Sequence, residues 1–338
     1  MQQSAQFPFS WFNSSPKINP VAQTATDNLP ESIRQKLIQA VQSLPPHPDS
    51  VASIQSTVES AFDHWLTSPT REANSLAIIS SPVTPVALIL AESLVQWLEE
   101  KDIGVRLLAW NTRPAEINTI TSKLKHYLNS SQENPDNPEI VLIPNLSYCF
   151  LRSLEGLDGI DYLQRLILRD RALTEENHTP RFWLIGLDQV TWHYLNAVSH
   201  FDAYCSESFC LPPLEGKQLR SWLNHIVKEF AIEIKTLTLK EQAKEEQENI
   251  FFTDLARVSQ GISTVAVEVF LQSIGYQTIE EEEGILVAKS PSLPPLPQLE
   301  MSDRYILYSF LLHGDLTLFA LAESLGDDLS QVQARVEI

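Results

Sequence analysis

The segment that most constrains the fold is a short buried strand followed by a proline-containing turn and a long apolar helix. Residues 74–80 read NSLAIIS, residues 81–85 read SPVTP, and residues 86–99 have the apolar spacing of a helix. A buried strand that passes through a tight turn into a helix is the repeating unit of parallel α/β sheets. The segment therefore predicts an α/β fold.

The same strand, turn and helix form the frame in which many proteins hold phosphate groups. Such a site needs glycines whose backbone N–H groups wrap the phosphates, a lysine that reaches them, and a Ser or Thr for Mg²⁺. The turn at 81–85 has no glycine and no lysine, and Pro82 and Pro85 lack the N–H donor. Ser81 and Thr84 remain as hydroxyls that either contact a nucleotide or, as is more usual, cap the following helix.

Short β-branched runs alternate with longer amphipathic stretches from about residue 72 onward. The predicted strands are 76–80, 105–110, 140–143 and 181–185, and the predicted helices between them are 86–101, 114–128 and 159–172. The last strand leads through Asp188 into a helix at 191–198 and an extended piece at 208–211. This alternation predicts a parallel sheet flanked by helices.

Charge and cysteine content limit the classes of partner and compartment. The 338 residues contain 24 Lys and Arg against 43 Asp and Glu, and the formal net charge is −19. Such a charge repels nucleic-acid backbones and anionic membranes. Three cysteines are too few for a disulfide framework, and no apolar run reaches membrane-spanning length. We therefore expect a cytoplasmic protein without a membrane span.

Taken in order, the elements of residues 72–338 resemble a bacterial AAA+/STAND-like P-loop ATPase with a helical lid and a winged helix. In that family the second-strand site reads hhhhD[DE], and its acid holds Mg²⁺. Here residues 140–146 read IVLIPNL, so Pro144 and Asn145 stand where carboxylates are expected. The two losses, at the turn and at this strand, are independent of each other.

Two further positions follow from the resemblance. It implies that residues 182–188 are the sensor-1 strand, with Asp188 beside the γ-phosphate, and that Arg257 on a lid helix is the sensor-2 arginine. Because a carboxylate repels phosphate, we interpret Asp188 as a cap of the helix at 191 instead. Arg169 and Arg171 match the place of an arginine finger, but the adjacent Asp170 favours a local ion pair.

The predicted organisation has six parts. They are a disordered tail at 1–28, an N-terminal helical segment at 29–71, a P-loop-like α/β domain at 72–213, a helical lid at 214–289 with an acidic hairpin tip at 280–283, a Pro-rich linker at 290–300, and a partial winged-helix-like module at 301–338. The module opens as a helix-turn-helix with Gly-Asp at 314–315 and 326–327. The tail carries the aromatic run FPFSWF at 7–12.

The preferred hypothesis is a pseudo-ATPase, an inactive P-loop protein that regulates or scaffolds through protein–protein contacts. It predicts no catalytic residue, no metal site and no required cofactor, and it leaves Ser81, Thr84, Asp188 and Arg257 as a vestigial nucleotide site. One alternative is a switch that binds ATP or ADP at the helix start without hydrolysing it. The other is a transcription-type regulator, although Arg335 is the only basic residue of the third helix at 329–338. Protein partners are expected, including a homo- or hetero-oligomer with an active relative.

Overall fold

The chain consists of two compact units. The structure, a computed structural model, describes residues 29–101, 103–128, 138–172, 180–235, 244–277 and 284–336. Contacts group residues 1–49 and 212–297 into unit 1, and residues 50–211 and 298–338 into unit 2. The predicted tail at 1–28 and the acidic tip at 280–283 lie outside the described residues.

Unit 2 is built on a five-stranded parallel sheet. Its strands are β1 (Ser75–Ser80), β2 (Gly104–Leu107), β3 (Glu139–Ile143), β4 (Arg181–Asp188) and β5 (Glu207–Cys210), in the spatial order β2-β3-β4-β1-β5. Every adjacent pair is parallel. The predicted parallel α/β sheet flanked by helices is thereby confirmed.

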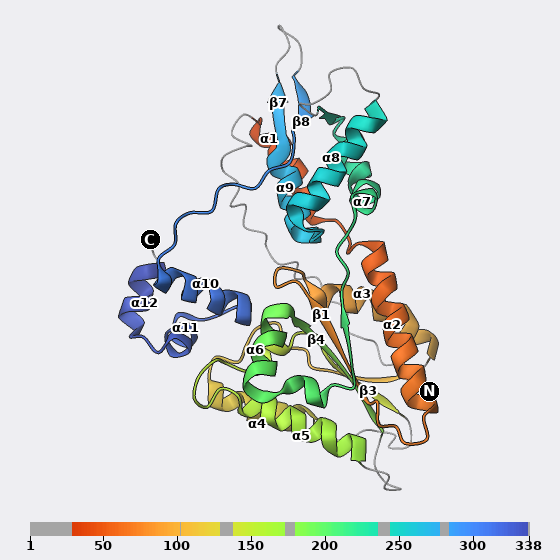
Figure 1. The fold of residues 1–338 in the computed structure, drawn as a ribbon, viewed down its shortest axis with the longest axis vertical. Helices are drawn as coiled ribbons and strands as arrows, with labels where there is room; N and C mark the ends of the chain where they lie inside the picture. Colours follow the sequence, from red (N-terminus) through yellow and green to blue (C-terminus); the bar gives the residue numbers. More distant parts are fainter. Residues whose placement is uncertain are drawn as a thin grey trace. The chain divides into compact units, whose positions relative to one another are not determined.

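Helices cover both faces of this sheet (Figure 1). Helices α2 (Pro48–Thr67) and α3 (Val86–Lys101) share one core cluster with alternate strand residues such as Phe182 and Leu184. The opposite face packs on α4 (Ile117–Leu128), α5 (Asp158–Ala172) and α6 (Gln189–Ser199) through residues such as Trp183 and Ile185. Because both faces are buried, the central strands are continuous apolar runs rather than alternating ones.

A glycine in β4 allows close packing at the centre of the sheet. A Cβ atom on Gly186 would collide with the carbonyl oxygen of Pro144 and would lie 2.8 Å from Leu90 Cδ1. Neither the backbone carbonyl nor the buried leucine can move without disturbing its neighbours. The position therefore excludes every larger residue for steric reasons.

Gly186→Ala is expected to lower the free energy of unfolding of unit 2 by about 1–3 kcal/mol, the usual cost of overpacking a core. Urea unfolding followed by tryptophan fluorescence measures this loss. The matched control is Gly275→Ala in strand β7 (Ile274–Gln277), where the nearest atom lies 3.9 Å from the added Cβ. If Gly275→Ala lowers the free energy of unfolding of unit 1 as much as Gly186→Ala lowers that of unit 2, the steric argument is wrong.

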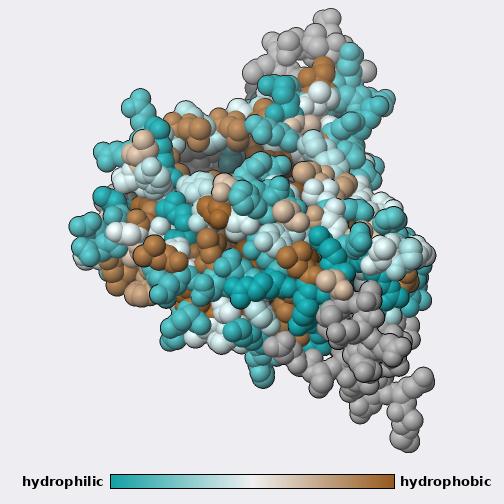
Figure 2. All heavy atoms as spheres, turned by 60° about the horizontal axis from the view of Figure 1, so that its bottom comes forward, coloured by the Kyte–Doolittle hydropathy of each residue, from teal (hydrophilic) through white to brown (hydrophobic). Residues whose placement is uncertain are grey.

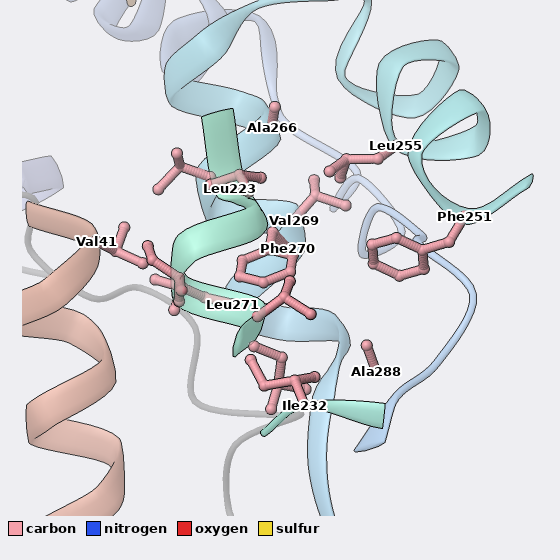
Figure 3. Close-up of a cluster of buried hydrophobic side chains, with 14 of the residues drawn as sticks. Val41, Leu223, Ile232, Phe251, Leu255, Ala266, Val269, Phe270, Leu271 and Ala288 are labelled. Atoms are coloured by element: carbon pink, nitrogen blue, oxygen red, sulfur yellow. The ribbon is translucent and has the colours of Figure 1, made fainter. Parts of the chain in front are cut away.

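Unit 1 is a helical unit with a small sheet. It contains α1 (Glu31–Gln42), α7 (Gly216–Glu229), α8 (Lys244–Ser259) and α9 (Ser263–Ser273), and a sheet of order β6 (Glu233–Ile234), β8 (Ile285–Ala288), β7. Strands β7 and β8 form the predicted antiparallel hairpin. The core of the unit is mainly aromatic and aliphatic, with Phe251 and Phe270 between α8 and α9 (Figure 3).

The last described segment of unit 2 is a three-helix module, here called the C-terminal module (residues 301–336). Its helices are α10 (Met301–His313), α11 (Leu318–Leu325) and α12 (Leu329–Val336), close to the helices predicted at 303–312, 318–325 and from 329 onward. None of the described helices is long and apolar enough to cross a membrane alone. Helices α10 and α11 meet that criterion only as a pair, and they are bent by 114° at their junction.

Candidate functional site

The candidate site is the carboxyl edge of the parallel sheet, where the turn at 81–85 joins β1 to α3. Part of the backbone of this turn is hydrogen-bonded within the turn. Thr84 donates its N–H to the carbonyl of Ser81 at 3.0 Å, and Val86 donates to the carbonyl of Thr84 at 2.8 Å. Pro82 and Pro85 have no N–H to offer. Four of the amide positions that could wrap a phosphate are therefore missing or already bonded.

Asp188 lies beside this turn, because the register of β1 and β4 pairs it with Ser80. It is the N-cap of α6, and its Oδ1 accepts from the N–H groups of Val190 and Thr191 at 2.8 and 2.9 Å. Its Oδ2 accepts from Thr191 Oγ1 at 2.7 Å and from Ser147 Oγ at 3.2 Å. The interpretation of Asp188 as a helix cap is confirmed, and both carboxylate oxygens are occupied.

Asn145, which follows β3, also has a local role. Its side chain caps the short 3₁₀ helix η2 (Leu146–Cys149) by accepting from the N–H of Ser147 at 3.1 Å. The hydroxyl of Ser147 lies 2.9 Å from that of Thr191. Asn145, Ser147, Thr191 and Asp188 thus form a hydrogen-bond network between the ends of β3 and β4.

The structure brings together only part of the predicted vestigial site. Ser81 and Asp188 share the sheet edge, and Thr84 takes part in the turn through its backbone. Arg257 belongs to unit 1, where it is 71% exposed in its side chain and pairs with Asp254 on its own helix at 3.0 Å. Within the described residues, no group of three or more His, Cys, Asp or Glu side chains could hold a metal ion.

The two candidate finger arginines have partners within unit 2. Arg169 forms an ion pair with the buried Asp170 at 2.8 Å, which is the local pairing expected from the sequence. Arg171 donates to the carbonyl of Tyr204 at 2.8 Å and to Ser206 Oγ at 3.2 Å. Arg171 therefore links α5 to the segment before β5 and has a structural role.

Sequence reasoning missed the residue that organises this edge, Arg113. Its Nη2 donates to the carbonyl of Ser147 at 2.6 Å and to that of His313 at 3.2 Å, and its Nη1 donates to the carbonyl of Asp315 at 3.2 Å. In addition, the hydroxyl of Thr191 lies 2.9 Å from the carbonyl oxygen of Leu312, so its one proton is shared between this oxygen and Asp188. The loop after α10 therefore lies on the ends of β3 and β4. No local signal around Arg113 could have revealed a contact 200 residues away.

Burial at this contact shifts the pKa of several groups. Desolvation, followed by the charges of Arg113 and Arg152, lowers the pKa of His313 to about 2, so its ring is neutral. Desolvation also lowers the pKa of Arg113 to about 10 and raises that of Cys149 to about 12. At neutral pH Arg113 keeps its positive charge, and Cys149 stays a thiol.

Comparisons with known proteins show similarity to solved structures only. No family model matches the chain, and no curated protein matches it. The chain is similar to the ADP form of the Aeropyrum pernix ORC2 protein, with 14% identity and a TM-score of 0.43, over 68% of this chain and 64% of that one. It is also similar to the Thermotoga maritima RuvB Holliday junction branch migration motor, with 12% identity and a TM-score of 0.38, over 86% and 85%.

A third similar structure is the HORMA:CdnC:Trip13 complex of E. coli MS115-1, with 13% identity and a TM-score of 0.36, over 68% of this chain and 78% of that chain. The chain thus spans less than two thirds of the ORC2 chain and most of the other two. Similarity at this level does not bear on activity, substrate or partners. The fold assignment rests on the parallel sheet itself.

Proposed function

We propose that the protein is a catalytically inactive, AAA+-like P-loop protein that regulates or scaffolds through protein–protein contacts. The observation that carries the proposal is the turn at 81–85, where Pro82 and Pro85 have no N–H and the amides of Thr84 and Val86 bond to carbonyls of the turn. The capping roles of Asp188 and Asn145 support it, because both side chains already accept hydrogen bonds from backbone N–H groups. Loss of the phosphate and metal groups at two separate strands removes the usual electrostatic basis of phosphoryl transfer.

Exposed apolar side chains support a role in protein contacts. The C-terminal module exposes large apolar residues on all three helices, with Phe319 at 63% and Met301 at 64% exposure. On the face of the molecule in Figure 2, hydrophobic side chains form small patches between hydrophilic ones. Exposed apolar side chains that lie next to one another are typical of surfaces that bind other proteins.

The module offers little to nucleic acid. Arg335 is the only basic residue of α12, and it lies 3.4 Å from Asp327 in an ion pair. A helix that reads DNA normally carries several cations for phosphate contacts. We therefore favour protein partners over DNA, and we expect them in the cytoplasm because all three cysteines are free thiols.

The proposal predicts that purified protein releases no binding heat with ATP or ADP, with or without Mg²⁺, and hydrolyses no ATP. Isothermal titration calorimetry and a phosphate-release assay measure both. Robust Mg²⁺-dependent hydrolysis would overturn the proposal. Micromolar binding without hydrolysis would instead support a nucleotide-binding switch.

Any binding heat can be assigned to the turn with one pair of variants. Val83→Asp places a negative charge at the exposed tip of the turn, and it should abolish nucleotide binding there by repulsion. Leu168→Asp is the matched control, because Leu168 is similarly exposed but lies on α5. Equal loss of binding in both variants would place the nucleotide elsewhere.

A further inference from the structure

The C-terminal module is held on the sheet by several polar contacts and by a few side chains of α10. Besides the three carbonyl contacts of Arg113, the N–H of Arg152 donates to His313 Nε2 at 3.2 Å. The guanidinium of Arg152 donates to the carbonyl of Ser324 at 2.9 and 3.3 Å and lies over the ring of Tyr308. Leu312 is fully buried in the core of the sheet, and the partly buried Tyr308 packs against the same core.

This contact leaves several buried polar atoms without partners. At this contact they are Arg113 Nε, His313 Nδ1 and Asp315 Oδ1. Two further unpaired buried atoms among the described residues belong to the side chains of Trp97 and Ser153. A buried donor or acceptor that lacks a hydrogen bond has lost its hydration without compensation. Separating the module from the sheet would hydrate these atoms, which offsets part of the cost of breaking the contact.

The module has the means to separate as a body. Its helices share a small core of their own, formed by Ile306, Leu321, Ala322 and Val332 with three partly buried neighbours. It is joined to the preceding strand by residues 290–300, which form no helix or strand and are mostly exposed. Loss of the sheet contact therefore need not unfold α10, α11 or α12.

We propose that the C-terminal module is a releasable cover, which undocks as a body from the carboxyl edge of the parallel sheet and is held there by Arg113. Undocking uncovers the hydrogen-bond network of Ser147, Thr191 and Asp188 together with the stacked rings of Phe150 and Tyr194. The cover lies on the ends of β3 and β4, beside the loop that carries Pro144 and Asn145. This proposal does not depend on whether nucleotide binds.

Hydrogen–deuterium exchange of the full chain, read by mass spectrometry, tests the proposal. The peptide covering 145–153 should exchange at least about tenfold faster than the β4 peptide 181–187, whereas the peptides of α10 keep their helical protection, because undocking as a body leaves both the sheet and the module helices intact. The amide of Arg152 is the direct reporter, since its hydrogen bond to His313 exists only in the docked state. Exchange of the 145–153 peptide only at the rate of β4 would overturn the proposal.

Variants identify the residue that holds the cover. Arg113→Ala should raise exchange in 145–153 by a further factor of about ten or more, because it removes three hydrogen bonds from a charged donor. Arg113→Lys, which keeps the charge with fewer donors, should give a smaller increase. Arg335→Ala is the control, because Arg335 lies in the same module and pairs with Asp327 away from the sheet.

The exchange pattern separates undocking from unfolding. In both Arg113 variants the peptides of β1 and β4 should keep the protection that they have in the unsubstituted protein. If the β1 and β4 peptides lose protection together with the 145–153 peptide, the contact is an integral part of the sheet core and the proposal is wrong. An effect of Arg335→Ala equal to that of Arg113→Ala would also contradict the assigned role of Arg113.

Discussion

Glu139→Ala is expected to lower the free energy of unfolding of unit 2 by about 3–5 kcal/mol, the cost of removing one partner from a buried ion pair. Glu139 is the first residue of β3 and lies between two buried arginines. Its Oε1 accepts from Arg106 Nε at 2.8 Å, and its Oε2 accepts from Arg181 Nε at 3.0 Å. The side chain of Glu139 is 3% exposed, so solvent cannot replace it.

The size of this effect follows from what remains after the substitution. Arg106 and Arg181 also donate to the carbonyls of Tyr127 and Leu128 at the end of α4, but these neutral groups cannot balance two positive charges. Without the carboxylate, the two guanidinium groups repel each other in a site of low effective dielectric. Glu139→Gln should cost less, because it keeps the size of the side chain and one acceptor.

Urea unfolding monitored by the fluorescence of the buried Trp65, Trp97 and Trp183 measures the loss. The matched control is Glu59→Ala, which breaks the exposed pair of Glu59 with Lys101 at 3.7 Å. Pairs of that kind contribute about 0–1 kcal/mol. A loss for Glu139→Ala no larger than that of the control would contradict the assigned importance of the buried charges.

Local sequence patterns predicted the elements of unit 2 well where burial on both faces dictates them. All five residues of β3 are buried. Its last four, 140–143, form an uninterrupted apolar run, which indicates a central parallel strand. The predicted strand at 105–110 is shorter in the structure, because β2 ends at Leu107 and Trp110 donates its N–H back to Leu108 in a turn. The two-residue strand β6 was too short to leave any periodic pattern.

The candidate site could be predicted only in part, for a physical reason. The missing glycines and lysine of the turn are visible in the sequence, and so is a cap position at Asp188. The contact of Arg113 with the loop after α10 has no such signal, because its acceptors are backbone carbonyls, which every residue carries. The sequence Gly-Asp at 314–315 indicated a turn but could not show that the turn lies on the sheet.

The second large effect concerns pH. Acidification from pH 6.5 to pH 5.0 is expected to lower the free energy of unfolding of unit 2 by about 2 kcal/mol through His313 alone, at about 1.36 kcal/mol per pH unit. His313 is fully buried, and its pKa is about 2 in the folded protein against 6.5 for an ordinary histidine. Between these two values the unfolded chain binds a proton that the folded protein does not, so stability falls as the pH falls.

The groups around His313 determine this direction. Arg113 and Arg152 face the ring with positive charge and oppose its protonation, and Phe150, whose ring centroid is 5.0 Å away, excludes water. Asp315 acts in the opposite sense, because burial raises the pKa of its carboxyl above the ordinary value of 3.8. That carboxyl binds its proton more readily in the folded protein, which offsets part of the loss toward the acidic end of the range.

His313→Gln should flatten the dependence of stability on pH between 6.5 and 5.0, because an amide does not titrate in this range and its oxygen can still accept from the N–H of Arg152. The measurement is urea unfolding of both proteins at several pH values. His193→Gln is the control, because His193 is exposed on α6. If the free energy of unfolding changes equally with pH in the unsubstituted protein and in both variants, the His313 ring is exposed to water in solution. Its ring would then not be part of a closed contact between the C-terminal module and the sheet.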